Sequence, residues 1–234
     1  MIPVPRAVLL DAFGTLVELE PPGPRLRVAL RERAGVEVTE DQAAQAIAAE
    51  VEFYRAHHDA GRDATSLAEL RRRCAEVTRD ALPAAARGLA IEQMLPILID
   101  SIRFRAFPEV PGALRALRAA GARLVVVSNW DVSLGEALAD AGLAALLDGA
   151  VSSAEAGAPK PGREIFDRAL ALARASAGEA IHVGDSVEHD VAGAWAAGIE
   201  AVLVRRDGAA GPAGVRTVAS LAELVPPPAY SSAQ

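Results

Sequence analysis

The chain has 234 residues, of which 51% are hydrophobic and 24% charged, and its formal net charge is -7. These proportions are typical of a soluble globular protein with one large or two modest domains. The negative charge disfavours nucleic acid as a partner, because a phosphate backbone binds a basic surface. The single cysteine, Cys74, excludes an internal disulfide framework and suits a reducing compartment.

No basic segment followed by a long apolar stretch opens the sequence, so we expect no signal peptide. No uninterrupted apolar run reaches the roughly 18 residues that a membrane-spanning helix needs. We therefore expect a cytoplasmic protein with no membrane partner, present as a monomer or a homodimer.

The first predicted element is a short apolar run, Val8 to Leu10, which ends abruptly at Asp11. Nothing in this run alternates between apolar and polar, and that pattern predicts a fully buried strand. Gly14 then allows the chain to turn. Asp11 should therefore lie at the carboxyl end of a buried strand, where open α/β sheets place their ligands.

Residues 20–105 are predicted to form an all-helical insert. The prolines of 21–24 indicate a hinge, and a first helix should run from Arg25 until Gly35 stops it. Pro96 should kink or split the last helix, which we place within 89–104. Two capping boxes predict the starts of the second and third helices: Thr39 with Gln42, and Ser66 with Glu69.

After residue 106 the pattern changes to strands alternating with helices. The predicted strands are 123–127, 149–153, 180–183 and 200–204, and the predicted helices include 113–120 and 187–197. This order predicts parallel βαβ units in a doubly wound α/β sheet. We expect an α/β domain formed by 1–19 and 106–234, and a helical domain formed by 20–105 and attached like a lid. The proline-rich end, 226–234, is expected to be a loose tail.

Polar residues follow the predicted strands at four places, which should meet at one edge of the sheet. They are Asp11, Ser128 with Asn129, the loop carrying Lys160, and Asp185 with Asp190. A carboxylate can attack phosphorus, and a hydroxyl with backbone N–H groups can hold phosphate oxygens. A lysine can neutralise charge in the transition state, and two further acids can hold Mg²⁺. The constellation therefore suits phosphoryl chemistry.

The four blocks resemble, in order, the motifs of the haloacid dehalogenase (HAD) superfamily, over residues 7 to about 205. The blocks are 11–16, 127–131, 160–161 and 184–190. The resemblance implies a Rossmann-like core with a helical cap. It also implies that Asp11 is the nucleophile and that Lys160 is the cation steadying nucleophile and phosphate. The residues around the phosphate would be Gly14, Thr15, Ser128 and Asn129. Asp11 and Asp185 would bind Mg²⁺, with Asp190 beside the metal or behind it.

One position departs from the pattern of the family's phosphatases, which usually carry a second aspartate two residues after the nucleophile. This sequence has Phe13 there. Its backbone carbonyl can still bind Mg²⁺, but its side chain cannot deliver a proton to a leaving oxygen. General acid–base help is typically worth about 10²–10⁴ in rate, so turnover of alkyl phosphates should suffer unless His189 or a cap residue substitutes.

Three functions remain open at this point. The first is a Mg²⁺-dependent phosphatase that acts on a small phosphorylated substrate through an aspartyl phosphate. The second is a metal-independent 2-haloacid dehalogenase, because that group carries an aromatic residue at the position of Phe13. The third is a non-catalytic relative that binds a phosphorylated metabolite or a protein. Asp185 and Asp190 beside Asp11 would repel one another without a cation, which favours the first function.

His182, within an apolar strand, is expected to be structural.

Overall fold

The computed structural model describes residues 5–225, so the expected tail at 226–234 lies outside the described residues. The chain divides into two compact units. The sheet unit contains the chain up to Glu18, Ala106–Ser128, and the chain from Leu134 onward. The helical unit contains Leu19–Arg105 and a second, short segment, Asn129–Ser133.

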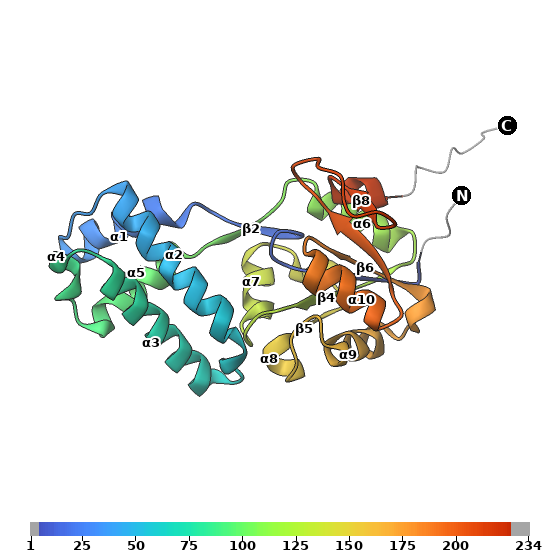
Figure 1. The fold of residues 1–234 in the computed structure, drawn as a ribbon, viewed down its shortest axis with the longest axis horizontal. Helices are drawn as coiled ribbons and strands as arrows, with labels where there is room; N and C mark the ends of the chain where they lie inside the picture. Colours follow the sequence, from blue (N-terminus) through green and yellow to red (C-terminus); the bar gives the residue numbers. More distant parts are fainter. Residues whose placement is uncertain (1–4, 226–234) are drawn as a thin grey trace. The chain divides into compact units, whose positions relative to one another are not determined.

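Six strands of the described region form the main sheet, in the order β5-β4-β1-β6-β7-β8 (Figure 1). All neighbouring pairs for which a register is defined are parallel. The strands are β1 (Ala7–Leu10), β4 (Arg123–Ser128), β5 (Gly149–Ser152), β6 (Ala180–Gly184), β7 (Glu200–Val204) and β8 (Arg216–Val218). The prediction of a doubly wound parallel sheet is confirmed, and it puts the carboxyl ends of β1, β4 and β6 side by side.

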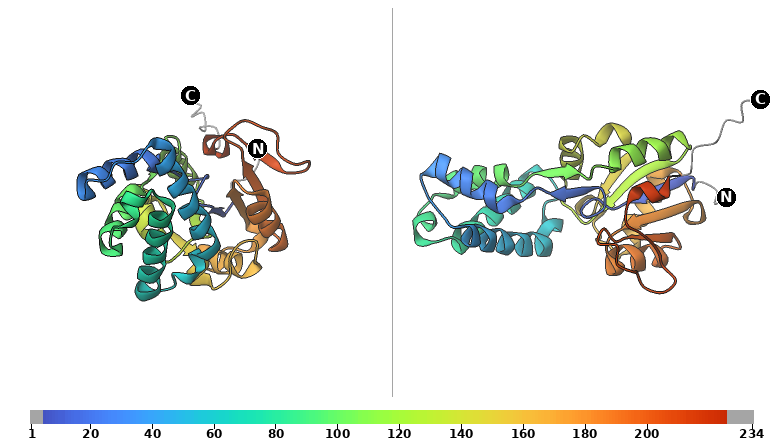
Figure 2. Two further views of the ribbon diagram at one scale, coloured as in Figure 1. Left: turned by 60° about the vertical axis from the view of Figure 1, so that its left-hand side comes forward. Right: turned by 90° about the horizontal axis from the view of Figure 1, so that it is seen from above.

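Helices cover both faces of this sheet (Figure 2). α6 (Val110–Ala119) and α7 (Leu134–Asp140) lie on one face, and α8 (Ser153–Ala156), α9 (Arg163–Ala173) and α10 (Ala192–Ala196) lie on the other. Side chains alternate along each strand, so Leu9 of β1 packs with Val125 and Phe166 on the α9 face. Val8 and its alternates point to the opposite face. Burial on both faces explains the continuous apolar runs.

The helical unit is built from α1 (Pro22–Ala34), α2 (Glu40–His57), α3 (Ala64–Ala81), α4 (Ala84–Arg87) and α5 (Ile91–Ser101). A single-turn 3₁₀ helix, η1 (His58–Ala60), separates α2 from α3. One buried cluster joins α1, α2, α3 and α5, and it includes Leu30, Ile47, Leu70 and Met94. This unit therefore has an apolar core of its own.

Two predicted helix starts are corrected by the structure, and the split expected as one outcome at Pro96 does not occur. α1 begins at Pro22 because prolines need no N–H partner in a first turn. α3 begins at Ala64, since Asp63 caps it with Ser66 at the third helical position; the predicted box from Ser66 to Glu69 is therefore wrong. α5 continues through Pro96 without a break, because Met94, Ile97 and Leu98 on either side of the proline are buried in the core. The capping box at Thr39 is confirmed.

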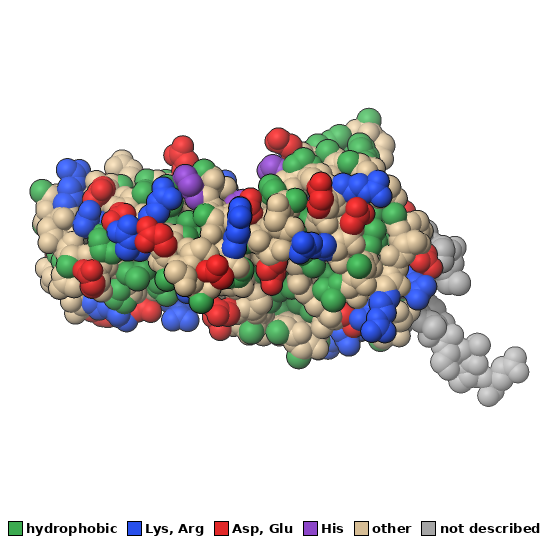
Figure 3. Space-filling view, turned by 90° about the horizontal axis from the view of Figure 1, so that it is seen from below, with side chains coloured by type: hydrophobic (Ala, Val, Ile, Leu, Met, Phe, Trp, Pro, Cys, Tyr) green, Lys and Arg blue, Asp and Glu red, His purple; other side chains and the backbone are tan. Residues whose placement is uncertain are grey.

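Two short strands that the sequence did not predict pair with each other where the chain passes between the units. They are β2 (Val17–Leu19) and β3 (Phe104–Ala106). On the surface shown in Figure 3, basic and acidic side chains are mixed over both units. Over residues 5–225, every helix is too short or too polar to cross a bilayer.

The core of the helical unit predicts a position-dependent loss of stability along α1. Leu30→Ala removes a fully buried side chain, so we expect the free energy of unfolding to fall by about 2–5 kcal/mol. Val28→Ala, at a side chain 45% exposed on the same helix, should change it by less than about 1 kcal/mol. Urea unfolding followed by Trp130 fluorescence, in a Trp195→Phe background, measures both variants. Equal losses in the two variants would contradict the described core.

Candidate functional site

Asp11 follows β1 directly, and a hydrogen bond to the backbone of β6, the neighbouring strand in the sheet, fixes its position. Its N–H donates to the Val183 carbonyl at 2.9 Å, and the residue is only 6% exposed. The chain then turns at Gly14, whose φ is +83°, a left-handed conformation that suits glycine. A Cβ at Gly14 would overlap the Asp185 carboxylate, so glycine also lets that acid approach the turn.

Arg206, just after β7, holds the loop that follows Asp11. Its guanidinium donates to the carbonyls of Gly14 at 3.0 Å and Thr15 at 2.6 Å, and to Glu109 Oε1 at 2.7 Å. It also stacks 3.3 Å from the ring centroid of Phe107. The sequence analysis missed this residue, because nothing local links it to a loop 190 residues earlier.

Gly14 and Thr15 were expected around the phosphate. The Gly14 N–H donates to the Val17 carbonyl at 2.9 Å, and the Thr15 side chain is fully buried. In this structure the two residues therefore shape the loop beside Asp11. Their role at a bound phosphate stays a prediction.

Ser128 and Lys160 both meet the Asp11 carboxylate. Ser128, the last residue of β4, donates from Oγ to Asp11 Oδ1 at 3.0 Å. Lys160 Nζ donates to Asp11 Oδ1 and to Asp190 Oδ1, each at 2.6 Å, and the lysine is 3% exposed. The structure thus brings these four sequence-predicted residues together. Asn129 belongs to the helical unit, so its predicted role at the phosphate stays a prediction.

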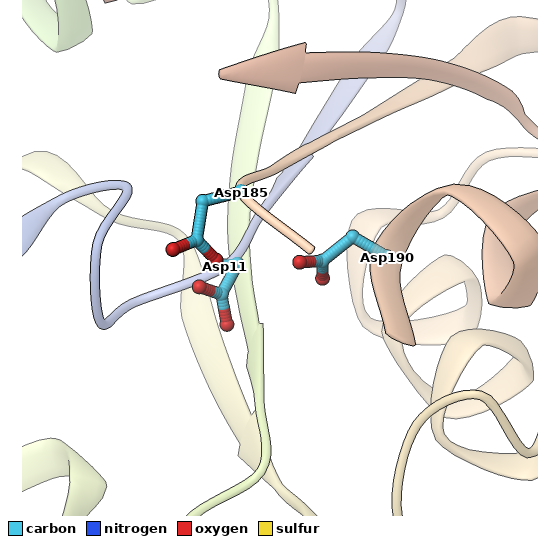
Figure 4. A group of neighbouring side chains, drawn as sticks. All are labelled: Asp11, Asp185 and Asp190. Carbon is cyan, nitrogen blue, oxygen red and sulfur yellow. The ribbon is translucent and has the colours of Figure 1, made fainter. Parts of the chain in front are cut away.

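Three carboxylates converge on the same point, as Figure 4 shows for Asp11, Asp185 and Asp190. Each offers one oxygen atom, and these oxygens lie within 4.8 Å of one another. Asp190 Oδ1 already accepts from Lys160 and from His182 Nε2, and its Oδ2 accepts from the Ser186 N–H at 3.0 Å. Protein donors therefore fill most of the acceptor positions of Asp190. Asp190 is for this reason better suited to support a metal ligand than to bind a metal ion itself.

The position of Asp190 depends on a local departure from α-helical geometry. The predicted helix 187–197 begins instead as a π-helical turn, η4 (Val187–Val191), and continues as α10. The Val191 N–H reaches back five residues to the Ser186 carbonyl, at 3.1 Å. Turns of this kind often occur at functional sites. A Cβ at Gly184 would overlap the Asp190 carboxyl group, so this glycine gives the acid its room.

Burial and charge pull the pKa values of these groups in different directions. Burial raises the pKa of Asp11 to about 6; the Lys160 charge opposes this rise, and the charges of Asp190 and Asp185 add to it. Burial alone would lower the pKa of Lys160, but Asp11 and Asp190 raise it above its usual range. Burial acts to raise the pKa of Asp190, but Lys160 and His182 hold it well below its usual range. The site therefore carries surplus negative charge around one permanent cation.

Phe13 is the large apolar side chain in the loop after Asp11, and it is 39% exposed. Its backbone bridges to Val17 within the tight turn. The ring offers neither a proton nor a charge, and the general acid–base gap expected from the sequence stays a prediction.

The segment that follows Ser128 is fastened within the helical unit. Asp131 Oδ2 accepts from the Tyr54 hydroxyl at 3.0 Å, and Asp131 Oδ1 accepts from the Ser133 N–H at 2.7 Å. The Val132 N–H donates to the Gly61 carbonyl at 3.0 Å. The contacts with Tyr54 and Gly61 join residues more than 70 positions apart, and no local pattern could have predicted them.

The raised pKa of Asp11 predicts how the metal-free protein responds to pH. Between the unfolded pKa of 3.8 and the folded pKa of about 6, the folded state holds a proton that the unfolded state has lost. The contribution of Asp11 to stability is therefore complete below pH 3.8 and is lost as pH rises through 6. Asp11→Asn removes this dependence, so its stability relative to wild type should rise between pH 4 and 6 and stay constant above. Urea unfolding across this range measures the difference; a flat difference would contradict the pKa.

Comparisons with known proteins agree with the geometry. Residues 5–198 match the family model described as "haloacid dehalogenase-like hydrolase". The chain is 42% identical over 91 residues to a bovine (Bos taurus) haloacid dehalogenase-like hydrolase domain-containing protein 3, covering 39% of this chain and 36% of that protein. It is 35% identical over 97 residues to ribulose-1,5-bisphosphate 5-phosphatase of Halopiger xanaduensis, covering 41% of each. The chain thus spans about two fifths of the curated relatives it matches.

Solved structures extend the likeness over nearly the whole chain. A HAD phosphatase from Thermococcus onnurineus is 25% identical with a TM-score of 0.64, covering 94% of this chain and 95% of that one. A 2-haloacid dehalogenase from Pseudomonas syringae is 26% identical with a TM-score of 0.65, covering 94% and 96%. Because the family model matches residues 5–198, which is most of this chain, and the motif residues meet at one sheet edge, the chain belongs to the haloacid dehalogenase-like hydrolases.

Proposed function

We propose that this hydrolase is a phosphatase that acts on a small phosphorylated substrate. One observation carries the proposal: Asp11 meets Ser128 and Lys160 at hydrogen-bond distance, with two more carboxylates gathered at the same point. The phosphatases among the relatives support the same reaction class. In this proposal the helical unit acts as a cap that selects the substrate.

The reaction begins when a carboxylate oxygen of Asp11 attacks phosphorus. The bond from phosphorus to the leaving oxygen breaks, the leaving oxygen takes a proton from solvent water, and an aspartyl phosphate remains. Ser128 then turns its hydroxyl from Asp11 to a phosphate oxygen, and Lys160 balances the charge that builds on the transferring group. Water attacks the phosphorus of the intermediate, which releases phosphate and restores the Asp11 carboxylate.

The residues present fit a divalent cation. Carboxylate oxygens within 4.8 Å of one another suit the hard, oxygen-preferring Mg²⁺, and the surplus negative charge at Asp11 calls for a counter-charge. Asp11 and Asp185 would hold the ion together with the Phe13 carbonyl. Asp190 would lie behind these ligands, where it accepts a hydrogen bond from Lys160. When bound, Mg²⁺ neutralises charge on the phosphate oxygens.

A dehalogenase is the second candidate, and two observations favour it. Phe13 supplies no proton, and a 2-haloacid dehalogenase is among the structures with the same fold. In that reaction Asp11 would attack carbon, displace halide and need no metal. The gathering of Asp185 and Asp190 with Asp11 argues against it, because uncompensated carboxylates repel one another.

A paired assay of phosphate release and halide release distinguishes the phosphatase from the dehalogenase. We expect phosphate release from p-nitrophenyl phosphate that depends on added Mg²⁺, and no halide release from 2-chloropropionate. Asp11→Asn should lower phosphate release by on the order of 10³-fold or more, because the nucleophile is lost. Asp167→Asn makes the same chemical change at an exposed residue of α9 and should leave the rate unchanged. Halide release without metal would establish the dehalogenase. No turnover of a broad phosphate panel, with Mg²⁺ binding retained, would point to a non-catalytic relative.

Phe13 predicts a gain of function on difficult substrates. Phe13→Asp adds a proton donor where alkyl leaving groups need one, so turnover of an alkyl phosphate should rise by up to about 10²-fold. Turnover of p-nitrophenyl phosphate, whose leaving group needs little protonation, should change much less. Phe13→Asn provides the matched control without an acidic proton. An equal effect of both variants on both substrates would mean that the leaving oxygen receives its proton elsewhere.

A further inference from the structure

His182 is a polar ring on an otherwise apolar face of the sheet. It lies on β6, in register with Leu9 of β1 on one side and Ala201 of β7 on the other, and is fully buried. The ring of Phe166 from α9 meets it edge to face, with centroids 5.0 Å apart. An aliphatic side chain would suit this environment better than an imidazole.

The imidazole has one polar contact, and that contact leads to the site. His182 Nε2 lies 2.8 Å from Asp190 Oδ1. Because Asp190 is a carboxylate that can only accept, Nε2 carries the hydrogen and donates it. The opposite nitrogen, Nδ1, is buried with no hydrogen-bond partner in the described part of the chain. Burying an unsatisfied nitrogen is unfavourable, so filling space does not explain a histidine here.

Asp190 Oδ1 receives two hydrogens, from His182 Nε2 and from Lys160 Nζ. The imidazole projects on a short side chain from β6, a central strand of the sheet, whereas the lysine ends a flexible four-carbon chain. Ser186 fixes the other oxygen through its backbone N–H. The two rigid donors therefore set the orientation of the carboxylate, and the carboxylate sets the position of the ammonium group.

We infer that His182 is a positioning residue, which orients Asp190 so that Lys160 is held against the nucleophile Asp11. The inference rests on the proposed function for its kinetic test, but the hydrogen-bonded chain from His182 to Lys160 is testable without turnover. His182 does not touch the reacting atoms in this scheme. Its effect reaches Asp11 through two other side chains.

Three variants separate positioning from packing. His182→Leu keeps the apolar bulk and removes the donor. His182→Gln places an amide N–H2 near the position of Nε2 and restores it. Phe166→Leu disturbs the same packing and leaves the hydrogen bond to Asp190 in place. The rate of phosphate release from p-nitrophenyl phosphate with Mg²⁺ should fall about 10–100-fold in His182→Leu, chiefly through kcat. It should stay within about 3-fold of wild type in the other two.

The second measurement uses the metal-free protein. Lys160 is the only lysine in the sequence, so protein labelled with ¹⁵N-lysine gives a single side-chain ammonium signal. We expect this signal to shift or broaden in His182→Leu, and to match wild type in His182→Gln and Phe166→Leu. Asp190→Asn should move it at least as far as His182→Leu does.

Each outcome decides the inference. A wild-type lysine signal in His182→Leu would overturn it, whatever the enzymatic activity. Equal losses of kcat in His182→Leu, His182→Gln and Phe166→Leu would also overturn it, because packing alone would then account for the effect. If the wild-type protein turns over no phosphate ester, the proposed function fails, while the lysine signal in the four variants still decides whether His182 orients the pair.

Discussion

One ammonium group shared between two buried carboxylates supports the rest of the site. Taking a charged side chain out of water costs several kcal/mol, so Asp11 and Asp190 need a counter-charge as near as Lys160 provides. A single positive charge cannot balance both of these carboxylates. The site is therefore built with a deficit of positive charge, which the proposed divalent ion would fill.

The backbone gives these charges their places. Each of two glycines, Gly14 and Gly184, lies against a carboxylate that a Cβ would displace. The π-helical turn η4 brings Asp190 over β6, and Arg206 ties the loop after β1 to the end of β7. The parallel register of β1, β4 and β6 then puts residues more than 100 positions apart within hydrogen-bond reach.

The sheet and the meeting of Asp11, Ser128 and Lys160 could be predicted from the sequence, because apolar runs mark buried strands and parallel strands end at one edge. Features that arise only from tertiary contact could not. Arg206 and the anchoring of Asp131 depend on distant partners, and the π-turn looks locally like an ordinary helix. His182 was expected to be merely structural, since its contact with Asp190 needs the fold to exist.

The scarcity of lysine has a chemical consequence for the protein. Every other basic side chain that carries a permanent charge is an arginine, so reagents that acylate lysine amines find one target in the whole sequence. That target is 3% exposed and bonded to two acids. The folded protein should therefore resist lysine acetylation, whereas a chain acetylated while unfolded would lose the positive charge that lies between Asp11 and Asp190.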